Sequence, residues 1–324
     1  MHMRKPRPFV LMSAVGLAAA AFVLAACGSS SSGGGAGASG GSAQPTGPIT
    51  VAAFNFGESK ILANMYADVL KKAGFDASVK PLGAREIVEP ALEKGSANGG
   101  VDVVPEYLAT FTEFLNTKEN GTNAPPKATP DVNATLAAAK DLAGKVGITV
   151  LTPSTAADEN AFATTKDFAT KNNLTTLSDL ANYKGPLILG GPPECPKRPF
   201  CEPGLQQTYG IHFTGFTSLD AGGPLTKKAL TQGKIQVGLV FSSDGGIDAL
   251  GLKVLQDDKH LQNPDVIVAT VNSKSVSDKL TAALNSVAAA LTTDDLIALN
   301  KKVDIDGGDP AQVAQEWLAS KGLA

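Results

Sequence analysis

Residues 49–74 read ITVAAFNFGESKILANMYADVLKKAG, and this stretch decides the fold class. Its first six residues, 49–54, are apolar and β-branched enough to form a buried strand. From Ser59 onward the spacing changes to that of an amphipathic helix, which ends at Gly74. The residues that share the apolar face of this helix are Ile61, Leu62, Met65, Tyr66, Val69 and Leu70. A strand followed by such a helix is the repeating unit of an α/β protein.

The same alternation continues downstream. The sequence predicts a strand at 77–82, a helix at 85–95 and a strand, VDVVPEY, at 101–107. After the loop at 116–130, a helix leads into the strand ITVLTP at 148–153. Strands that alternate with helices are typical of a mainly parallel sheet with helices on its faces.

A second run of strands begins after Pro153. AFATT, PLILGG, FTSLD and QVGLVFS are strand-like, LKVLQ and DVIVATV follow, and helices at 275–300 and 309–321 end the chain. Two α/β units predict two lobes with a cleft between them. Because open α/β sheets bind ligands beyond the carboxyl ends of their strands, seven segments are expected to face this cleft. They are 54–59, 83–86, 105–107, 153–160, 190–200, 220–223 and 241–244.

The N-terminus predicts export. Three Lys and Arg residues precede the apolar run LMSAVGLAAAAFVLAAC, and its last four residues, 24–27, resemble a bacterial lipobox. We expect a signal peptide at 1–26, a lipid-modified Cys27 and a flexible Gly/Ser linker over 27–48. The lipid would hold the protein on the outer face of the cytoplasmic membrane. The alternative is an uncleaved anchor, since about 17 apolar residues can marginally span a bilayer.

Composition argues against several classes of protein. Without its first 26 residues the chain has 298 residues, of which 25 are basic and 31 acidic. This mildly acidic balance gives no reason to expect a nucleic-acid partner. His212 and His260 are isolated, and no base, nucleophile or metal ligands stand in a catalytic arrangement. We therefore expect no enzymatic activity, no metal and no cofactor.

The segment PPECPKRPFCEPG, residues 192–204, contains Cys195 and Cys201. This pair could form a metal clip, a redox pair or a disulfide. Its five-residue gap differs from the two- to four-residue gap typical of zinc sites and from a CxxC redox motif. Disulfides persist in exported proteins, so the predicted compartment favours a disulfide.

Several motifs resemble one family. Asn55-Phe56-Gly57-Glu58-Ser59, followed by LANMYADVL, is similar to the N-F-T-E-Q…GNMYA opening of the ProX/OpuAC-type substrate-binding lipoproteins of ABC importers, which carry glycine betaine, choline or carnitine. The likeness extends from about residue 50 to the C-terminus. Further segments that resemble the family are LGAREIVEPALEKG, VDVVPEY, PSTAADENAFATT, LVFSSDGGI and LKVLQDDKHLQNPDVIVATVNS.

The resemblance implies an α/β, two-lobed, periplasmic-binding-protein-like fold of type II, a Venus-flytrap with the ligand cleft between its lobes. Lobe 1 would be discontinuous, 48–152 plus 249–324, and lobe 2 would be 153–248. The lobes would close on a hinge around a small-molecule solute. The closed protein, acting as a monomer, would then deliver the solute to a membrane permease coupled to a cytoplasmic ATPase. The alternatives are a ligand that is not a quaternary amine, such as a polyol, amino acid derivative or aromatic compound, and a sensory or scaffold domain without transport.

The resemblance also implies the site. In the family, tyrosines from both lobes enclose the quaternary ammonium group, which is recognised by aromatic faces. Tyr107 is retained here, Phe241 replaces a second tyrosine, and a third falls at 222–224, where no aromatic residue stands. Arg198, inside the predicted disulfide ring, aligns with an arginine that reaches the ligand's carboxylate. The candidate ligand-binding residues are Phe54, Asn55, Glu58, Ser59, Arg85, Tyr107, Asp158, Asn160, Arg198, Asp220, Phe241 and Ser242.

Overall fold

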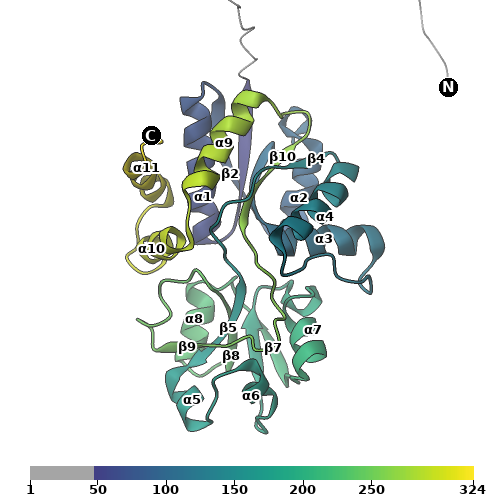
Figure 1. Ribbon diagram of the computed structural model, residues 1–324. Helices are drawn as coiled ribbons and strands as arrows, with labels where there is room; N and C mark the ends of the chain where they lie inside the picture. The colour runs from purple at the N-terminus through teal and green to yellow at the C-terminus, as the bar shows by residue number, and fades with distance from the viewer. Residues whose placement is uncertain (1–46) are drawn as a thin grey trace, which may run out of the picture. The chain divides into compact units, whose positions relative to one another are not determined.

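The computed structural model describes residues 47–324, which fold into two five-stranded sheets with helices packed around them (Figure 1). The predicted alternation of strands and helices is confirmed, and so is the α/β class. The expected signal peptide, Cys27 and most of the linker lie outside the described residues. The described residues belong to one compact unit.

The first sheet has the strand order β2-β1-β3-β10-β4. β1 runs parallel to β2 and β3, whereas β10 is antiparallel to β3 and β4. The sheet is mixed because β10 enters it on the chain's return from the second sheet. Its strands are β1 (Pro48–Phe54), β2 (Asp76–Gly83), β3 (Val103–Tyr107), β4 (Ile148–Val150) and β10 (Ile267–Asn272).

The second sheet has the order β7-β6-β8-β5-β9. β6 runs parallel to β7 and β8, and β5 is antiparallel to β8 and β9. Its strands are β5 (Asn160–Thr165), β6 (Ile188–Gly191), β7 (Gly215–Ser218), β8 (Val237–Phe241) and β9 (Leu252–Leu255).

Helices cover both sheets. Those beside the first sheet are α1 (Gly57–Lys72), α2 (Arg85–Lys94), α3 (Leu108–Asn120), α4 (Val132–Lys145), α9 (Asp278–Ala290), α10 (Thr293–Asp304) and α11 (Pro310–Ser320). Those beside the second are α5 (Lys166–Lys171), α6 (Leu177–Ala181), α7 (Glu202–Gly204) and α8 (Pro224–Thr231). Short 3-10 turns lie at η1 (Ser96–Asn98) and η2 (Cys195–Lys197), and η3 (Leu205–Tyr209) is a π-helical turn.

α1 forms the centre of the first core. It buries the six apolar residues that the spacing predicted, among them Tyr66, which is 1% exposed. Figure 1 shows α9, α10 and α11, which come from the end of the chain, on the same side of the first sheet as α1. This packing brings residues some 240 positions apart in the sequence together, Glu58 and Asn300 for example.

Two segments connect the sheets. The first crossing is residues 151–159, between β4 and β5. The second is residues 256–266, between β9 and β10, and so lies beyond the expected lobe boundary at residue 249. The reason is that β9 pairs with β5, with Phe162 opposite Leu255, which keeps the chain in the second sheet.

The two crossings run side by side and are joined by backbone hydrogen bonds. The Asp158 N–H donates to the Asp265 carbonyl at 3.0 Å, and the Ser154 N–H donates to the carbonyl of Ile267, the first residue of β10, at 2.8 Å. Crossing segments of this kind can act as a hinge between two lobes. Residues 242–251 connect β8 to β9, two strands of the second sheet, and so are not a crossing between the sheets.

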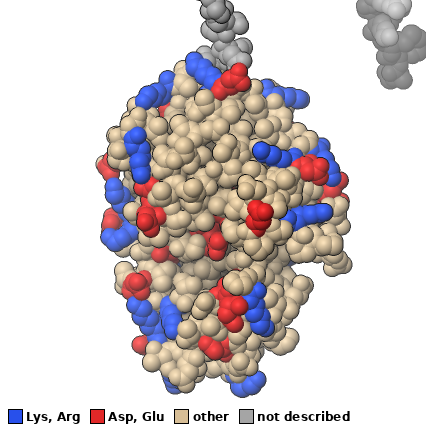
Figure 2. Space-filling view, viewed as in Figure 1, with Lys and Arg blue, Asp and Glu red and all other residues tan. Residues whose placement is uncertain are grey.

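Charged side chains of both signs are interspersed over the face seen in Figure 2. In the described part of the chain no single helix is both long and apolar enough to cross a membrane; α9 and α10 meet those criteria only as a pair, bent by 90°.

Candidate ligand-binding site

A cavity of about 720 Å³ lies between the two sheets. Its volume is within the range of small-molecule sites, about 300–1,000 Å³. The lobe around the first sheet contributes the segments that follow β1, β2 and β3. The lobe around the second sheet contributes the β6–η2 segment and the ends of β7 and β8, and the first crossing completes the wall. The lining includes nine of the twelve candidate residues: Phe54, Asn55, Arg85, Tyr107, Asp158, Asn160, Arg198, Asp220 and Phe241.

Four aromatic rings gather on one wall of this cavity. Phe56 lies at the centre, with ring centroids 6.0 Å from Phe54, 6.0 Å from Tyr107 and 5.5 Å from Phe241. Phe56 was not among the candidate residues, although its segment was expected to face the cleft. With Phe56, the aromatic wall is larger than the sequence comparison with the family implied.

Ser59 and Ser242 do not line the cavity. The Ser59 hydroxyl is fully buried and accepts a hydrogen bond from the Phe54 N–H at 2.9 Å. The Ser242 hydroxyl accepts one from the Glu159 N–H at 2.8 Å. Both hydroxyls therefore hold backbone next to the cavity and do not project into it.

Glu58 is buried behind the aromatic wall and lines a smaller cavity of about 220 Å³. Its Oε1 accepts a hydrogen bond from the Tyr107 hydroxyl at 2.7 Å, and its Oε2 accepts from the Ser243 hydroxyl at 2.7 Å and the Asn300 amide at 2.6 Å. Burial raises the pKa of Glu58, and these three donors oppose the rise. Because Ser243 follows β8, the carboxylate joins the two lobes and also fixes the ring of Tyr107.

Arg85 is held by Glu106. The guanidinium donates from Nε at 2.9 Å and from Nη2 at 2.7 Å to the two carboxylate oxygens, and Nη2 also donates to the Thr110 hydroxyl at 3.0 Å. Both members of the pair are buried, with side chains 7% and 2% exposed. The guanidinium carbon lies 5.5 Å from the centroid of the Phe54 ring. Glu106 was not predicted as a site residue, although it precedes Tyr107 in the PEY motif.

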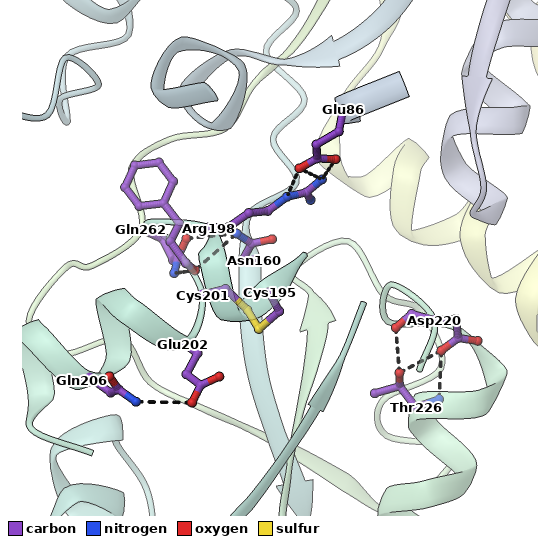
Figure 3. The surroundings of a disulfide bond; sticks show 11 residues. Glu86, Asn160, Cys195, Arg198, Cys201, Glu202, Gln206, Asp220, Thr226 and Gln262 are labelled. Atoms are coloured by element: carbon purple, nitrogen blue, oxygen red, sulfur yellow. Dashed lines mark hydrogen bonds and ion pairs between the residues drawn. A yellow bond between two sulfur atoms is a disulfide. The ribbon is translucent and has the colours of Figure 1, made fainter. Parts of the chain in front are cut away.

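Cys195 and Cys201 form a disulfide, as predicted (Figure 3). Arg198 lies within the ring that this disulfide closes, lines the cavity and pairs with Glu86 on α2, at 3.0 Å between Nη2 and Oε2. The side chains of this ion pair are 33% and 42% exposed. It joins the lobes at the rim of the cavity, although a pair so exposed contributes only about 0–1 kcal/mol.

Asp158 and Asn160 come from the first crossing and the start of β5. Asp158 is 2% exposed, and its Oδ1 accepts a hydrogen bond from the Ser243 N–H at 3.0 Å. Its Oδ2 has no hydrogen-bond partner among the described residues. Burial raises the pKa of Asp158 well above its ordinary value, and the charge of Glu58 adds to the rise. The Asn160 amide makes two long contacts, each 3.5 Å, with the Phe200 carbonyl and Gln262 Oε1.

Asp220 lines both cavities but uses its carboxylate locally. Oδ2 accepts from the Leu225 N–H at 2.9 Å. Oδ1 accepts from the Thr226 N–H, also at 2.9 Å (Figure 3). These N–H groups belong to the first turn of α8, where free donors need a partner. Asp220 therefore fixes the start of α8 beside the cavity.

The chain is similar to known substrate-binding proteins. Residues 47–320 match a family described as the substrate binding domain of the ABC-type glycine betaine transport system. Glycine betaine-binding protein YehZ of Escherichia coli (strain K12) is 28% identical over 292 residues, which are 86% of this chain and 92% of that protein. Carnitine transport binding protein OpuCC of Listeria monocytogenes serotype 1/2a (strain 10403S) is 28% identical over 290 residues, 86% of this chain and 88% of its own. A crystal structure of a glycine betaine/carnitine/choline ABC transporter superimposes with a TM-score of 0.63 at 26% identity, covering 85% of this chain and 99% of that one.

Proposed function

Because this chain belongs to the family of substrate-binding domains of ABC-type glycine betaine transport systems, we propose that it captures a small quaternary-ammonium solute in the cavity between its lobes. Glycine betaine, carnitine and choline are the compounds to consider, since they are named for the relatives. The family serves transport and is not enzymatic. Hinge closure would then present the loaded protein to the permease.

The aromatic wall is the observation that carries this proposal. A quaternary ammonium group has no N–H to donate, so it is recognised by the negative faces of aromatic rings. Phe56 contacts the rings of Phe54, Tyr107 and Phe241, and the four rings, which come from both lobes, all line the cavity. A polyol would instead need many hydrogen-bonding groups on this wall. The rings therefore favour a quaternary amine over the alternative ligand classes.

Closure is supported by contacts that join the lobes. Glu58 on α1 accepts from Ser243 after β8, and Arg198 pairs with Glu86 across the rim. The two hydrogen-bonded crossings at 151–159 and 256–266 would bend as these contacts open.

The test is the stability of the purified mature chain with glycine betaine, carnitine or choline added separately. A ligand at a hundredfold excess over its Kd adds about 2.7 kcal/mol to the free energy of unfolding. We expect at least one of the three to raise the melting temperature in proportion to the logarithm of its concentration. If none does, while a polyol or amino acid derivative does, the quaternary-amine proposal is wrong.

We also propose that a lipid on Cys27 anchors the protein, as a monomer, to the outer face of the cytoplasmic membrane. The lipobox-like residues 24–27 and the Gly/Ser-rich stretch that follows support this anchor. Cys27→Ala is expected to move the protein from the membrane fraction into the soluble fraction. Recovery of the unaltered protein in the soluble fraction would contradict the anchor.

A further inference from the structure

We propose that α10 and the β8–β9 loop, residues 242–251, form a latch that holds the two lobes closed. α10 belongs to the first lobe and the loop to the second. None of the described residues that line the 720 Å³ cavity belongs to either segment. This role rests on the proposed function, because closure is the step that retains the solute. It goes further in assigning the closed state to a contact outside the cavity that holds the solute.

The loop approaches α10 so closely that it has no room for a side chain. A Cβ at Gly245 would lie 2.5 Å from the Ile297 carbonyl oxygen and 2.8 Å from Lys301 Cβ. A Cβ at Gly246 would lie 2.5 Å from Cδ1 of Ile305, the residue after α10. Neither glycine has a positive φ, so the loop's own backbone would accept another residue at these positions. Glycine is needed here because of the helix of the other lobe.

Buried polar groups fasten the same contact. Asn300 of α10, which is 5% exposed, donates from Nδ2 to the Ser243 carbonyl at 3.1 Å. Lys227 of α8, which is 4% exposed, pairs with Asp244 of the loop at 2.6 Å and lies 3.9 Å from Asp304 at the end of α10. Water would replace these partners once the lobes separate, so each bond adds only a modest net stability. A contact of this kind can both hold and release.

The latch is connected to the aromatic wall through Glu58. Its carboxylate accepts from the Asn300 amide and from the Tyr107 hydroxyl, so α10 and one ring of the wall share a single acceptor group. Phe241, a ring from the other lobe, directly precedes the loop. A solute that holds both rings in place therefore also favours docking of α10. By linkage, docking of α10 strengthens the binding of the solute.

The latch lies to one side of the hinge. Figure 1 shows α10 at the lower left of the first lobe, above α8 and to the left of the crossings at 151–159 and 256–266. Because these crossings are the connections between the two sheets within residues 47–324, a rotation about them moves the loop relative to α10. The close approach at Gly245 is then lost when the lobes separate.

The first test weakens the latch with Gly245→Ala in the mature chain. The added Cβ meets the Ile297 carbonyl, so the closed state becomes less populated and affinity should fall about tenfold. We expect most of this loss as faster release of radiolabelled solute. The probe is whichever of glycine betaine, carnitine and choline raises the melting temperature most. Gly144→Ala on α4, where a Cβ meets open space, is the matched control and should bind as the unaltered protein does.

The second test locks the latch. A Cβ at position 246 would lie 3.1 Å from Cγ1 of Ile305, so the double variant Gly246→Cys with Ile305→Cys places two sulfurs within reach of a disulfide after oxidation. Without any solute, the bridged protein should be more compact than the unaltered protein in small-angle X-ray scattering. It should also admit the probe at least about tenfold more slowly, because entry requires opening. Gly246→Cys alone, measured in parallel, gives the effect of the substitution without the bridge.

The outcomes separate the latch from the proposed function. Entry of the probe into the bridged protein at the unaltered rate overturns the latch, since the lobes would then open with α10 still docked. Binding by Gly245→Ala as tight as by Gly144→Ala also overturns it, and both results leave the proposed function intact. If none of the three solutes binds the unaltered protein, the proposed function is wrong. The scattering comparison then still decides the latch, because a bridged protein no more compact than the unaltered one contradicts it.

Discussion

Replacing Arg85 with Met will lower the free energy of unfolding by about 3–5 kcal/mol. The guanidinium is the partner of Glu106, which is 2% exposed and accepts hydrogen bonds from Nε and Nη2. Without it, the Tyr107 N–H, at 3.1 Å, is the one donor left to Glu106 among residues 47–324. The carboxylate must then stay charged in an apolar site or take up a proton, and both cost stability. Urea unfolding at neutral pH measures the loss.

Two further variants show whether the loss comes from the unpaired charge. Lys71→Met breaks an exposed ion pair, Lys71–Asp68, and should change stability by no more than about 1 kcal/mol. The double variant Arg85→Met with Glu106→Leu removes both charges and should recover most of the loss, because a buried pair exchanged for apolar residues is often neutral. A loss in Arg85→Met no larger than in Lys71→Met would contradict the argument.

The helices and strands of this fold could be predicted from periodicity, but the partner of a strand could not. The apolar face of α1 is the one that the spacing at residues 61–70 predicts, because a helix closes its own hydrogen bonds. LKVL at 252–255 has the composition of a strand, yet nothing local states which sheet it joins. Its pairing with β5 places the second crossing after residue 255. The resemblance to the family had implied that the second lobe ends at residue 248.

The site was predictable to the level of segments. All twelve candidate residues lie in the segments that the strand-end rule selected, and nine of them line the cavity. The same rule cannot say which side chain of a segment enters the cavity. The Ser59 hydroxyl accepts a hydrogen bond from the Phe54 N–H, whereas the ring of Phe56, three residues earlier, packs against Phe241 in the aromatic wall. The ion pair of Arg198 with Glu86 joins residues 112 apart, which no local pattern reveals.

Phe56→Ala should weaken binding of a quaternary-ammonium solute about 30- to 100-fold. The substitution removes one aromatic face, which contributes about 0.5–2 kcal/mol to binding a cation. It also removes the ring that contacts Phe54, Tyr107 and Phe241, and each such pair contributes about 0.5–1.5 kcal/mol. The remaining rings then lose their fixed positions. A total of about 2–3 kcal/mol in binding corresponds to the stated change, at about 1.4 kcal/mol for each tenfold.

The face of the ring and its volume can be separated at this position. Phe56→Leu keeps an apolar side chain to pack against the three rings but has no π-face, so affinity should still fall about tenfold. Phe56→Tyr keeps the face and should bind within about threefold of the unaltered protein. Phe168→Ala, which breaks the edge-to-face contact with Tyr183 outside the cavity lining, should leave affinity unchanged while lowering stability. If Phe56→Leu binds as tightly as the unaltered protein, the ring packs the wall without touching the ammonium group, and the recognition must lie with Tyr107 and Phe241.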